Sequence, residues 1–175
     1  KDYTVTTSIT AYNTLDQVLQ MARTTLDSGV TTTETDAANR TYDAWGRLLT
    51  SSVSIREQGT GFDKTSTVTT SITGYNTPGQ VIWMFRTTVD NGVTTTETDS
   101  SARTYDSRGR LTYSKTSVTE VGTGLSKDYT VTTSITGYNA LGQVAQMIRT
   151  TVDSGLTTVE TDKADRTYDS RGRLT

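Results

Sequence analysis

The chain has 175 residues, a net charge of −2, and neither cysteine nor histidine. Without cysteine there is no disulfide, thiol nucleophile or thiolate metal site, and without histidine the commonest general base and metal ligand are missing. Basic and acidic residues are interleaved, which leaves no basic stripe for nucleic acid. No apolar run reaches the length of a membrane-spanning helix. We therefore expect no enzyme, no cofactor, no nucleic-acid partner and no membrane insertion.

The apolar content is low, and threonine dominates the composition. Leu, Ile, Val and Phe together number 32, whereas threonine alone numbers 42. So few large apolar residues make disorder a fair alternative, but the small net charge and the β-branched threonines favour strands. A thin sheet with modest burial fits this composition best.

The first 75 residues predict a series of strands joined by short turns. We expect strands over 1–12, 17–27, 30–42, 47–57 and 64–75, separated by turns at 13–16, 28–29, 43–46 and 59–61. Ser28-Gly29 is replaced by Asn91-Gly92 and Ser154-Gly155 in later copies, and Asn-Gly between two strand-like runs predicts a two-residue type I′ hairpin. Because every connection is short, successive strands should pair antiparallel in chain order.

The two-residue hairpin fixes a register. With Asp27 facing Val30, Arg23 falls opposite Glu34, so we expect a cross-strand ion pair worth roughly 0.2–1 kcal/mol. The later copies give the pairs Arg86 with Glu97 and Arg149 with Glu160. The other face of the hairpin carries Val18, Ala22 and Leu26 and is the face that we expect to be buried.

The whole chain repeats with a period of 63 residues. Its turn tyrosines are separated by 30, 33, 30, 33 and 30 residues, so each period holds two unequal hairpin units. We interpret residues 1–175 as one continuous array, with periods near 1–63, 64–126 and an incomplete 127–175. The chain starts at Lys1 without methionine and stops one residue after a turn motif, so both ends look cut.

The strongest repeated signal is the turn Tyr-Asp-x-x-Gly-Arg-Leu. The aspartate can accept hydrogen bonds from amides two residues on, and the glycine can adopt the left-handed conformation. We assign the structural turn to its tyrosine, aspartate, glycine and arginine, which are Tyr42, Asp43, Gly46 and Arg47, then Tyr105, Asp106, Gly109 and Arg110, then Tyr168, Asp169, Gly172 and Arg173. A related Tyr-Asn-x-x-Gly-Gln-Val turn alternates with it, and Asp16 replaces the glycine in its first copy.

These turns resemble the YD repeats, also called RHS repeats, of bacterial surface and toxin-associated proteins and of animal teneurins. The resemblance implies a long β-sheet strip that spirals into a hollow shell, in some cases around a toxin, and an association with carbohydrate binding. The units here are longer and more regular than is usual in that family, which favours a periodic, extended assembly over a closed one. The resulting fold prediction is all-β: antiparallel hairpins forming a coiled or spiralling, solenoid- or shell-like sheet.

Two groups of side chains could form a site. Glu34 and Asp36 lie two apart on one strand face, with copies at Glu97 and Asp99 and at Glu160 and Asp162. A calcium site would need several more oxygen ligands, so a solvated face balanced by Arg23 and Arg40 is the preferred interpretation, with no metal. Tyr42, Tyr105, Tyr168, Trp45 and Trp83 could stack against sugar rings, although their place beside turns favours packing.

The prediction for function is structural. We expect a segment of a bacterial extracellular or cell-surface protein that serves as a filament, stalk or shell wall and contacts further copies of the repeat. A carbohydrate-binding adhesin and the wall of a toxin-encapsulating shell are the alternatives.

Overall fold

The computed structural model describes residues 3–175, which form β-strands and no helix. The eleven strands are β1 (Tyr3–Tyr12), β2 (Val18–Asp27), β3 (Val30–Tyr42), β4 (Leu48–Gly59), β5 (Phe62–Tyr75), β6 (Val81–Asp90), β7 (Val93–Tyr105), β8 (Leu111–Gly122), β9 (Leu125–Tyr138), β10 (Val144–Asp153) and β11 (Leu156–Thr161).

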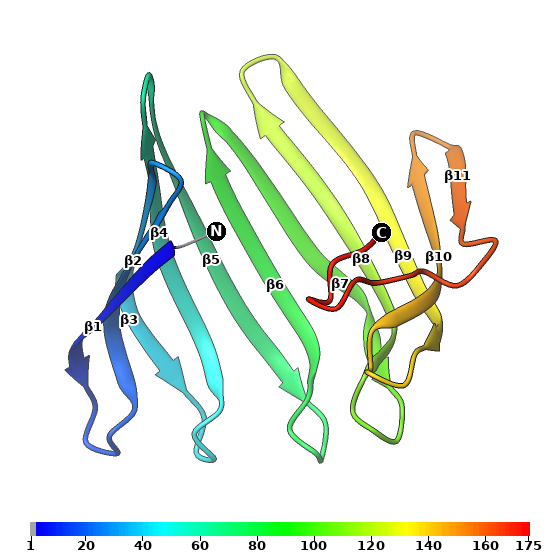
Figure 1. The fold of residues 1–175 in the computed structure, drawn as a ribbon, viewed down its shortest axis with the longest axis horizontal. Coiled ribbons are helices and arrows are strands. Elements are labelled where there is room, and N and C mark those ends of the chain that lie inside the picture. Colours follow the sequence, from blue (N-terminus) through cyan, green and yellow to red (C-terminus); the bar gives the residue numbers. More distant parts are fainter. Residues whose placement is uncertain (1–2) are drawn as a thin grey trace. The chain divides into compact units, whose positions relative to one another are not determined.

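The strands form one open sheet in chain order, from β1 at one edge to β11 at the other. Strands β1 to β5 pair antiparallel in succession, as do β9, β10 and β11. A short turn joins each strand to the next, as the ribbon shows (Figure 1). The expected all-β class and the succession of antiparallel hairpins are therefore confirmed.

Contacts within the chain define two compact units. The first contains the chain up to residue 73, together with 84–96 and 120–126, and the second contains 74–83, 97–119 and 127–175. Strands β1–β4 lie entirely in the first unit, and β10 and β11 lie entirely in the second.

The two-residue hairpins are present at all three positions. Asp27 pairs with Val30, so Ser28 and Gly29 form the loop, and both have positive φ, 52° and 81°. The equivalent residues of the later copies also have positive φ at both positions. Because a type I′ turn requires this conformation twice, the predicted turn type is confirmed.

The turn between β4 and β5 is tighter than the sequence suggested. Phe62 pairs with Gly59, which leaves only Thr60 and Gly61 in the loop and lengthens both strands. A side chain on Gly59 would collide with the Phe62 ring. The glycine therefore makes room for an aromatic ring across the strand pair, a packing effect that turn propensity alone does not reveal.

The face that we expected to be buried is the wrong one. It carries Leu26, which is 48% exposed, and Ala22 pairs on this face with Thr35. Asp36 follows Thr35 and so lies on the opposite face, where its side chain is almost fully covered. Asp99, which is also buried, lies one period after Asp36, and the buried Val118 lies one period after Ile55, which pairs with Glu34.

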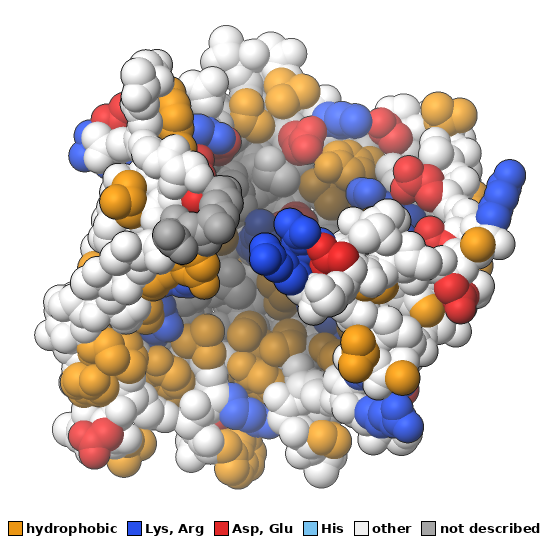
Figure 2. Space-filling view, viewed as in Figure 1, with side chains coloured by type: hydrophobic (Ala, Val, Ile, Leu, Met, Phe, Trp, Pro, Cys, Tyr) orange, Lys and Arg blue, Asp and Glu red, His pale blue; other side chains and the backbone are white. Residues whose placement is uncertain are grey.

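The prediction chose the wrong face because the apolar side chains on the Asp36 face come from four different strands. Ile9 pairs with Met21, and Val53 pairs with both Asp36 and Val68, so these apolar side chains form a row across the sheet. The apolar spacing within β2 alone points to the other face. In a single-layer sheet few residues are fully buried, and apolar side chains remain visible among polar and charged ones on the surface (Figure 2).

Candidate functional site

Five-residue turns close the hairpins at the ends that carry the tyrosines. In the second turn the Asp43 amide donates to the Arg47 carbonyl at 2.9 Å, and the Gly46 amide donates to the Asp43 carbonyl at 3.0 Å. Gly46 has φ 79°, and Asp16 takes the same left-handed conformation in the first turn with φ 58°. Aspartate tolerates this conformation better than most residues, which explains why it can stand there.

The aspartate side chain organises each Tyr-Asp turn. Asp43 Oδ1 accepts hydrogen bonds from the amides of Trp45 and Arg47, both at 2.9 Å, and its Oδ2 accepts one from Arg47 Nε at 2.6 Å. Asp106 and Asp169 have the same three kinds of partner at 2.7–2.9 Å. One carboxylate therefore binds both the loop and the arginine that immediately precedes the returning strand.

These bonds shift the acidity of the turn aspartates. The Arg110 amide, its guanidinium and the Arg108 amide lower the pKa of Asp106, and the equivalent groups lower the pKa of Asp169. At Asp43 burial alone would raise the pKa, but the hydrogen bonds from Arg47 and Trp45 outweigh burial and lower it. The hydrogen bonds of the folded turns thus stabilise the ionised form of these three carboxylates.

The Tyr-Asn turns reproduce this arrangement without charge. Asn13 Oδ1 accepts from the amides of Leu15 and Gln17, while its Nδ2 donates to Gln17 Oε1 at 2.5 Å. Asn139 and Gln143 repeat all of these contacts. Asn-Gln and Asp-Arg are therefore interchangeable solutions to the same turn.

Within each unit, tyrosine hydroxyls join neighbouring turns. Tyr42, which ends β3, donates to the carbonyl of Val18, the first residue of β2, at 2.5 Å. Tyr105 donates in the same way to Val81 and Tyr168 to Val144. In the second unit Tyr138 donates to Leu111, which continues the series from an Asp turn to an Asn turn.

The turns also touch through their glycines. A side-chain carbon on Gly46 would lie 2.9 Å from Gln17 Nε2, and one on Gly109 would lie 2.8 Å from Gln80 Nε2. Where the preceding turn carries arginine, the guanidinium of Arg110 lies 4.2 Å from the centre of the Tyr138 ring. Successive turns within each unit therefore form a stack, in which each turn binds the backbone or the ring of its neighbour.

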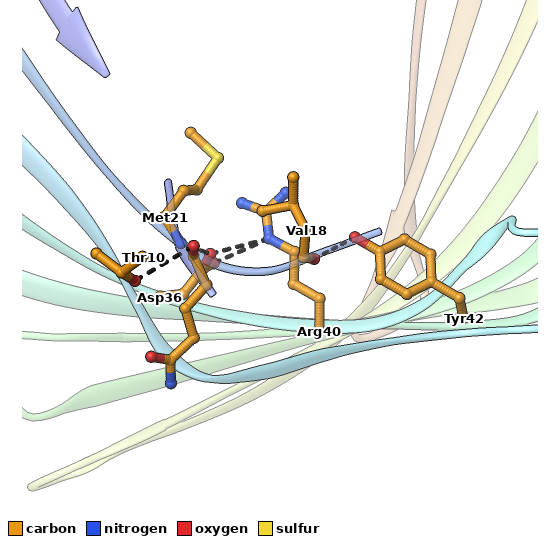
Figure 3. A network of polar contacts seen from close by, with 7 residues as sticks. Thr10, Val18, Met21, Asp36, Arg40 and Tyr42 are labelled. Carbon is orange, nitrogen blue, oxygen red and sulfur yellow. Dashed lines mark hydrogen bonds and ion pairs between the residues drawn. The ribbon is translucent and has the colours of Figure 1, made fainter. Parts of the chain in front are cut away.

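A second recurrent network lies where β2 and β3 stop pairing through their backbones. Their ladder ends at Ala22 and Thr35, and beyond it Asp36 Oδ2 accepts from the Met21 amide at 2.8 Å. Arg40 Nε reaches both oxygens of Asp36, at 3.0 and 3.1 Å. The Asp36 carboxylate thus replaces a backbone partner, and Figure 3 shows it between Met21 and Arg40.

The same network recurs in the later periods. Arg103 pairs with Asp99, and Arg166 pairs with Asp162, whose Oδ2 accepts from the Met147 amide at 2.9 Å. The side chains of Asp36 and Asp99 are both 1% exposed, whereas that of Asp162 is 23% exposed.

The residues of the predicted ion pairs surround these networks. Arg23 lies opposite Glu34 with Nη1 3.7 Å from Oε2, and Arg149 lies opposite Glu160 at 3.9 Å. Each pair lines a shallow depression that also contains an Asp36-type aspartate and its arginine, of about 280 Å³ in the first unit and about 250 Å³ in the second. Arg86 and Glu97 lie in β6 and β7.

The depressions offer little to a metal ion. Both oxygens of Asp36 already accept hydrogen bonds, and across residues 3–175 no group of three or more metal-ligating side chains was found. The structure thus brings Glu34 and Asp36 onto one face without assembling a calcium shell around them.

The aromatic residues considered for sugar binding lie in unlike surroundings. Tyr42, Tyr105 and Tyr168 are half-buried, and their hydroxyls are used within the turn stack. Trp45 is 80% exposed at a turn tip, with the Arg47 guanidinium 4.8 Å from its ring centre. Trp83 of β6 lies close to Gly74 of β5 and is 37% exposed. The three tyrosine hydroxyls are thus engaged within the turn stack, whereas most of the Trp45 side chain is exposed.

Sequence reasoning missed the links between turns. The signal was present, because Tyr42, Tyr105 and Tyr168 each follow their acceptor residue by 24 positions. A tyrosine placed at a fixed distance from the preceding turn could have been interpreted as a cross-hairpin contact.

No protein-family model matches this chain, and no curated protein or solved structure matches it. Among residues 3–175 there is also no helix long and apolar enough to cross a membrane.

Proposed function

We propose that this chain is a structural repeat segment of a bacterial extracellular or cell-surface protein, a wall element of a filament, stalk or shell related to the YD/RHS repeats. The observation that carries the proposal is the turn stack, in which tyrosine hydroxyls and turn glycines join one hairpin to the next. These links need no contribution from a central core, so an array built from them can grow by adding periods.

The hydrogen bonds of the charged side chains that recur from period to period support a structural role. In each Tyr-Asp turn the carboxylate is bound by two amides and a guanidinium, and each Asp36-type carboxylate is bound by an arginine. A general acid or base needs a carboxyl group whose proton is available near neutral pH, whereas hydrogen bonds to the turn amides and arginines lower the pKa of Asp43, Asp106 and Asp169. We accordingly propose no enzymatic activity.

The proposed assembly is a coiled strip. Antiparallel strands twist with a fixed hand, and a long sheet of consecutive hairpins must coil, close or stack as it grows. Partners would be further copies of the same repeat.

Electron microscopy of a longer array, made by joining several 63-residue periods, tests this proposal. Regular fibres with an axial repeat are the expected result, and closed hollow particles would favour the shell wall over the filament. A compact globular particle whose size does not grow with the number of periods would contradict the proposal.

A carbohydrate-binding adhesin is the second candidate, and the exposure of Trp45 at a turn tip favours it. Amphipathic aromatic rings at such positions suit sugar faces. Glycan binding that is lost in Trp45→Ala but kept in Leu15→Ala, which changes the tip of the preceding turn, would support this function.

A further inference from the structure

We propose that Asn91 is a site of spontaneous covalent modification. The backbone nitrogen of Gly92 displaces the side-chain amide of Asn91, and the isoaspartate that results opens the β6–β7 hairpin. This loop belongs to the second period and lies inside the array, where strands precede and follow it. The inference goes beyond the proposed structural role, because it names the point at which covalent chemistry breaks the repeat.

The loop between β6 and β7 differs from its two counterparts in one residue. Asn91 and Gly92 alone form the turn between the two strands, with φ 48° and 76°. Asn91 is the one asparagine of the chain that a glycine follows. Glycine favours attack on the asparagine side chain because it has no Cβ to obstruct the approach of its nitrogen. Serine stands in place of Asn91 in the other two periods and has no amide to lose.

Both reacting groups are unhindered. Asn91 is exposed, and a Cβ placed on Gly92 would have no atom within 4 Å. Within residues 3–175, neither the Asn91 side chain nor the Gly92 amide has a hydrogen-bond partner. The nitrogen therefore approaches the side chain without first breaking a contact.

The reaction needs only water as a co-reactant. The nitrogen of Gly92 forms a bond to Cγ of Asn91, and the bond between Cγ and Nδ2 breaks. Ammonia leaves with the proton of the attacking amide, and a cyclic imide remains. Water then opens the imide at one of its two carbonyl groups, which gives aspartate or isoaspartate. Nothing is oxidised or reduced.

The asparagines of the Tyr-Asn turns are protected from this reaction. Asn13 Oδ1 accepts from the amides of Leu15 and Gln17, and its Nδ2 donates to Gln17 Oε1. Asn139 makes the same three kinds of bond. These side chains must give up their hydrogen bonds before Cγ can be attacked. One molecule thus contains a reactive asparagine and protected ones.

Isoaspartate does not fit this loop. It adds a methylene group to the backbone, whereas a two-residue type I′ turn needs fixed dihedral angles to align its strands. The new carboxylate also follows Asp90 directly. Asp90 Oδ2 lies 2.8 Å from Lys64 Nζ, but its Oδ1 is buried without a partner among the described residues.

The serine loops support the equivalent aspartates better. Ser28 donates to Asp27 Oδ1 at 2.7 Å, and Ser154 donates to Asp153 Oδ1 at 3.1 Å. The second period therefore has a loop that is both chemically reactive and the least supported by side-chain bonds.

Incubation of the folded chain at mildly alkaline pH, followed by peptide mapping with mass spectrometry, tests the inference. We expect exchange of amide for carboxylate at Asn91 to be at least about tenfold faster than at Asn13 and Asn139, whose hydrogen bonds must break first. Isoaspartyl methyltransferase should label the peptide that contains residue 91. A free peptide of residues 84–96 gives the reference rate. Reaction in that peptide but not in the folded chain would overturn the inference, because the hairpin would then hold Asn91 away from the attacking nitrogen.

Asn91→Ser is the matched variant, because it reproduces the Ser-Gly loop of the other two periods. We expect this variant to keep its amide-exchange protection in β6 and β7 after incubation. The incubated parent should lose protection there by at least about tenfold and keep it in β2 and β3. Equal loss in the two chains, or full protection in a parent chain that contains isoaspartate, would contradict the opening of the hairpin by this modification.

Discussion

Two stretches of the first unit have the same seven residues in different surroundings. Thr4–Thr10 lies in the edge strand β1 and is exposed throughout, whereas Thr67–Thr73 lies in β5 between two strands and is half-buried at all but its last residue. Because the sequences are identical, the neighbours alone make the difference. Burial in this molecule is a property of the array and not of the individual strand.

The third period repeats this comparison at the other edge. The Tyr-Asp turn still closes there, with the Asp169 amide bound to the Arg173 carbonyl at 2.9 Å, but the strand before it is cut short. Turns are thus encoded locally, while the full length of a strand depends on the strand beside it.

The largest effect on the free energy of unfolding is expected at the buried aspartates, where a position covered by a neighbouring strand can be compared with one that is not. Asp36→Ala leaves the Met21 amide and the Arg40 guanidinium without their partner, which should lower the free energy of unfolding by about 3 kcal/mol. The more exposed Asp162 lacks the covering strand, so Asp162→Ala should cost about 1 kcal/mol. Urea denaturation of both variants measures the difference, and equal losses would show that the neighbouring strand adds nothing at this position.

The next largest effect is expected at the turn glycines. Gly109→Ala forces an alanine into a left-handed conformation and pushes it against Gln80, for a loss of about 2 kcal/mol. Gly92, with φ 76° and open space around it, is the matched control, because Gly92→Ala carries only the conformational cost of about 1 kcal/mol. The same thermal shift in both variants would argue against contact between stacked turns.

A smaller effect is expected from a single tyrosine hydroxyl. Tyr105→Phe removes the hydrogen bond to Val81 and should cost about 1 kcal/mol. Tyr12 belongs to the first turn and is 54% exposed, so Tyr12→Phe should change stability by less than about 0.5 kcal/mol. Chemical denaturation measures the free energy of unfolding of both variants. If Tyr105→Phe is as stable as the parent, the tyrosine hydroxyl does not stabilise the turn stack.

The smallest effect is expected from the charge of the turn aspartates. Their pKa values are lowered in the folded chain, so their stabilisation is fully present above the unfolded pKa of about 4 and is lost as pH falls through the folded values. Asp106→Asn introduces the residue found in the Tyr-Asn turns and keeps the hydrogen bonds to the turn amides. It should slightly reduce the loss of stability at acid pH. The free energy of unfolding is measured between neutral and acid pH. If the Asp106→Asn variant loses as much stability on acidification as the parent, the Asp106–Arg110 pair is not the source of that loss.

The sequence was sufficient for the strand order and for the Asn-Gly, Ser-Gly and Tyr-Asp-x-x-Gly turns, because these signals act over a few residues. It placed the turn between β4 and β5 too broadly, since Phe62 pairs with Gly59. It was insufficient for the buried face. The apolar residues around Asp36 come one or two at a time from four strands, so no single segment shows their pattern. The tyrosine links and the close approach of Gln17 to Gly46 were missed for the same reason, since they join turns that lie about 30 residues apart in the chain.

Amide hydrogen exchange of the two identical stretches tests the central claim most directly. If neighbours set the environment, amides of residues 68–73 in β5 should be protected throughout, because strands lie on both sides, whereas only alternate amides of residues 5–10, those facing β2, should be protected. Equal protection in both stretches would contradict the account, because it would show that the sequence of the strand, and not its place in the array, determines its stability.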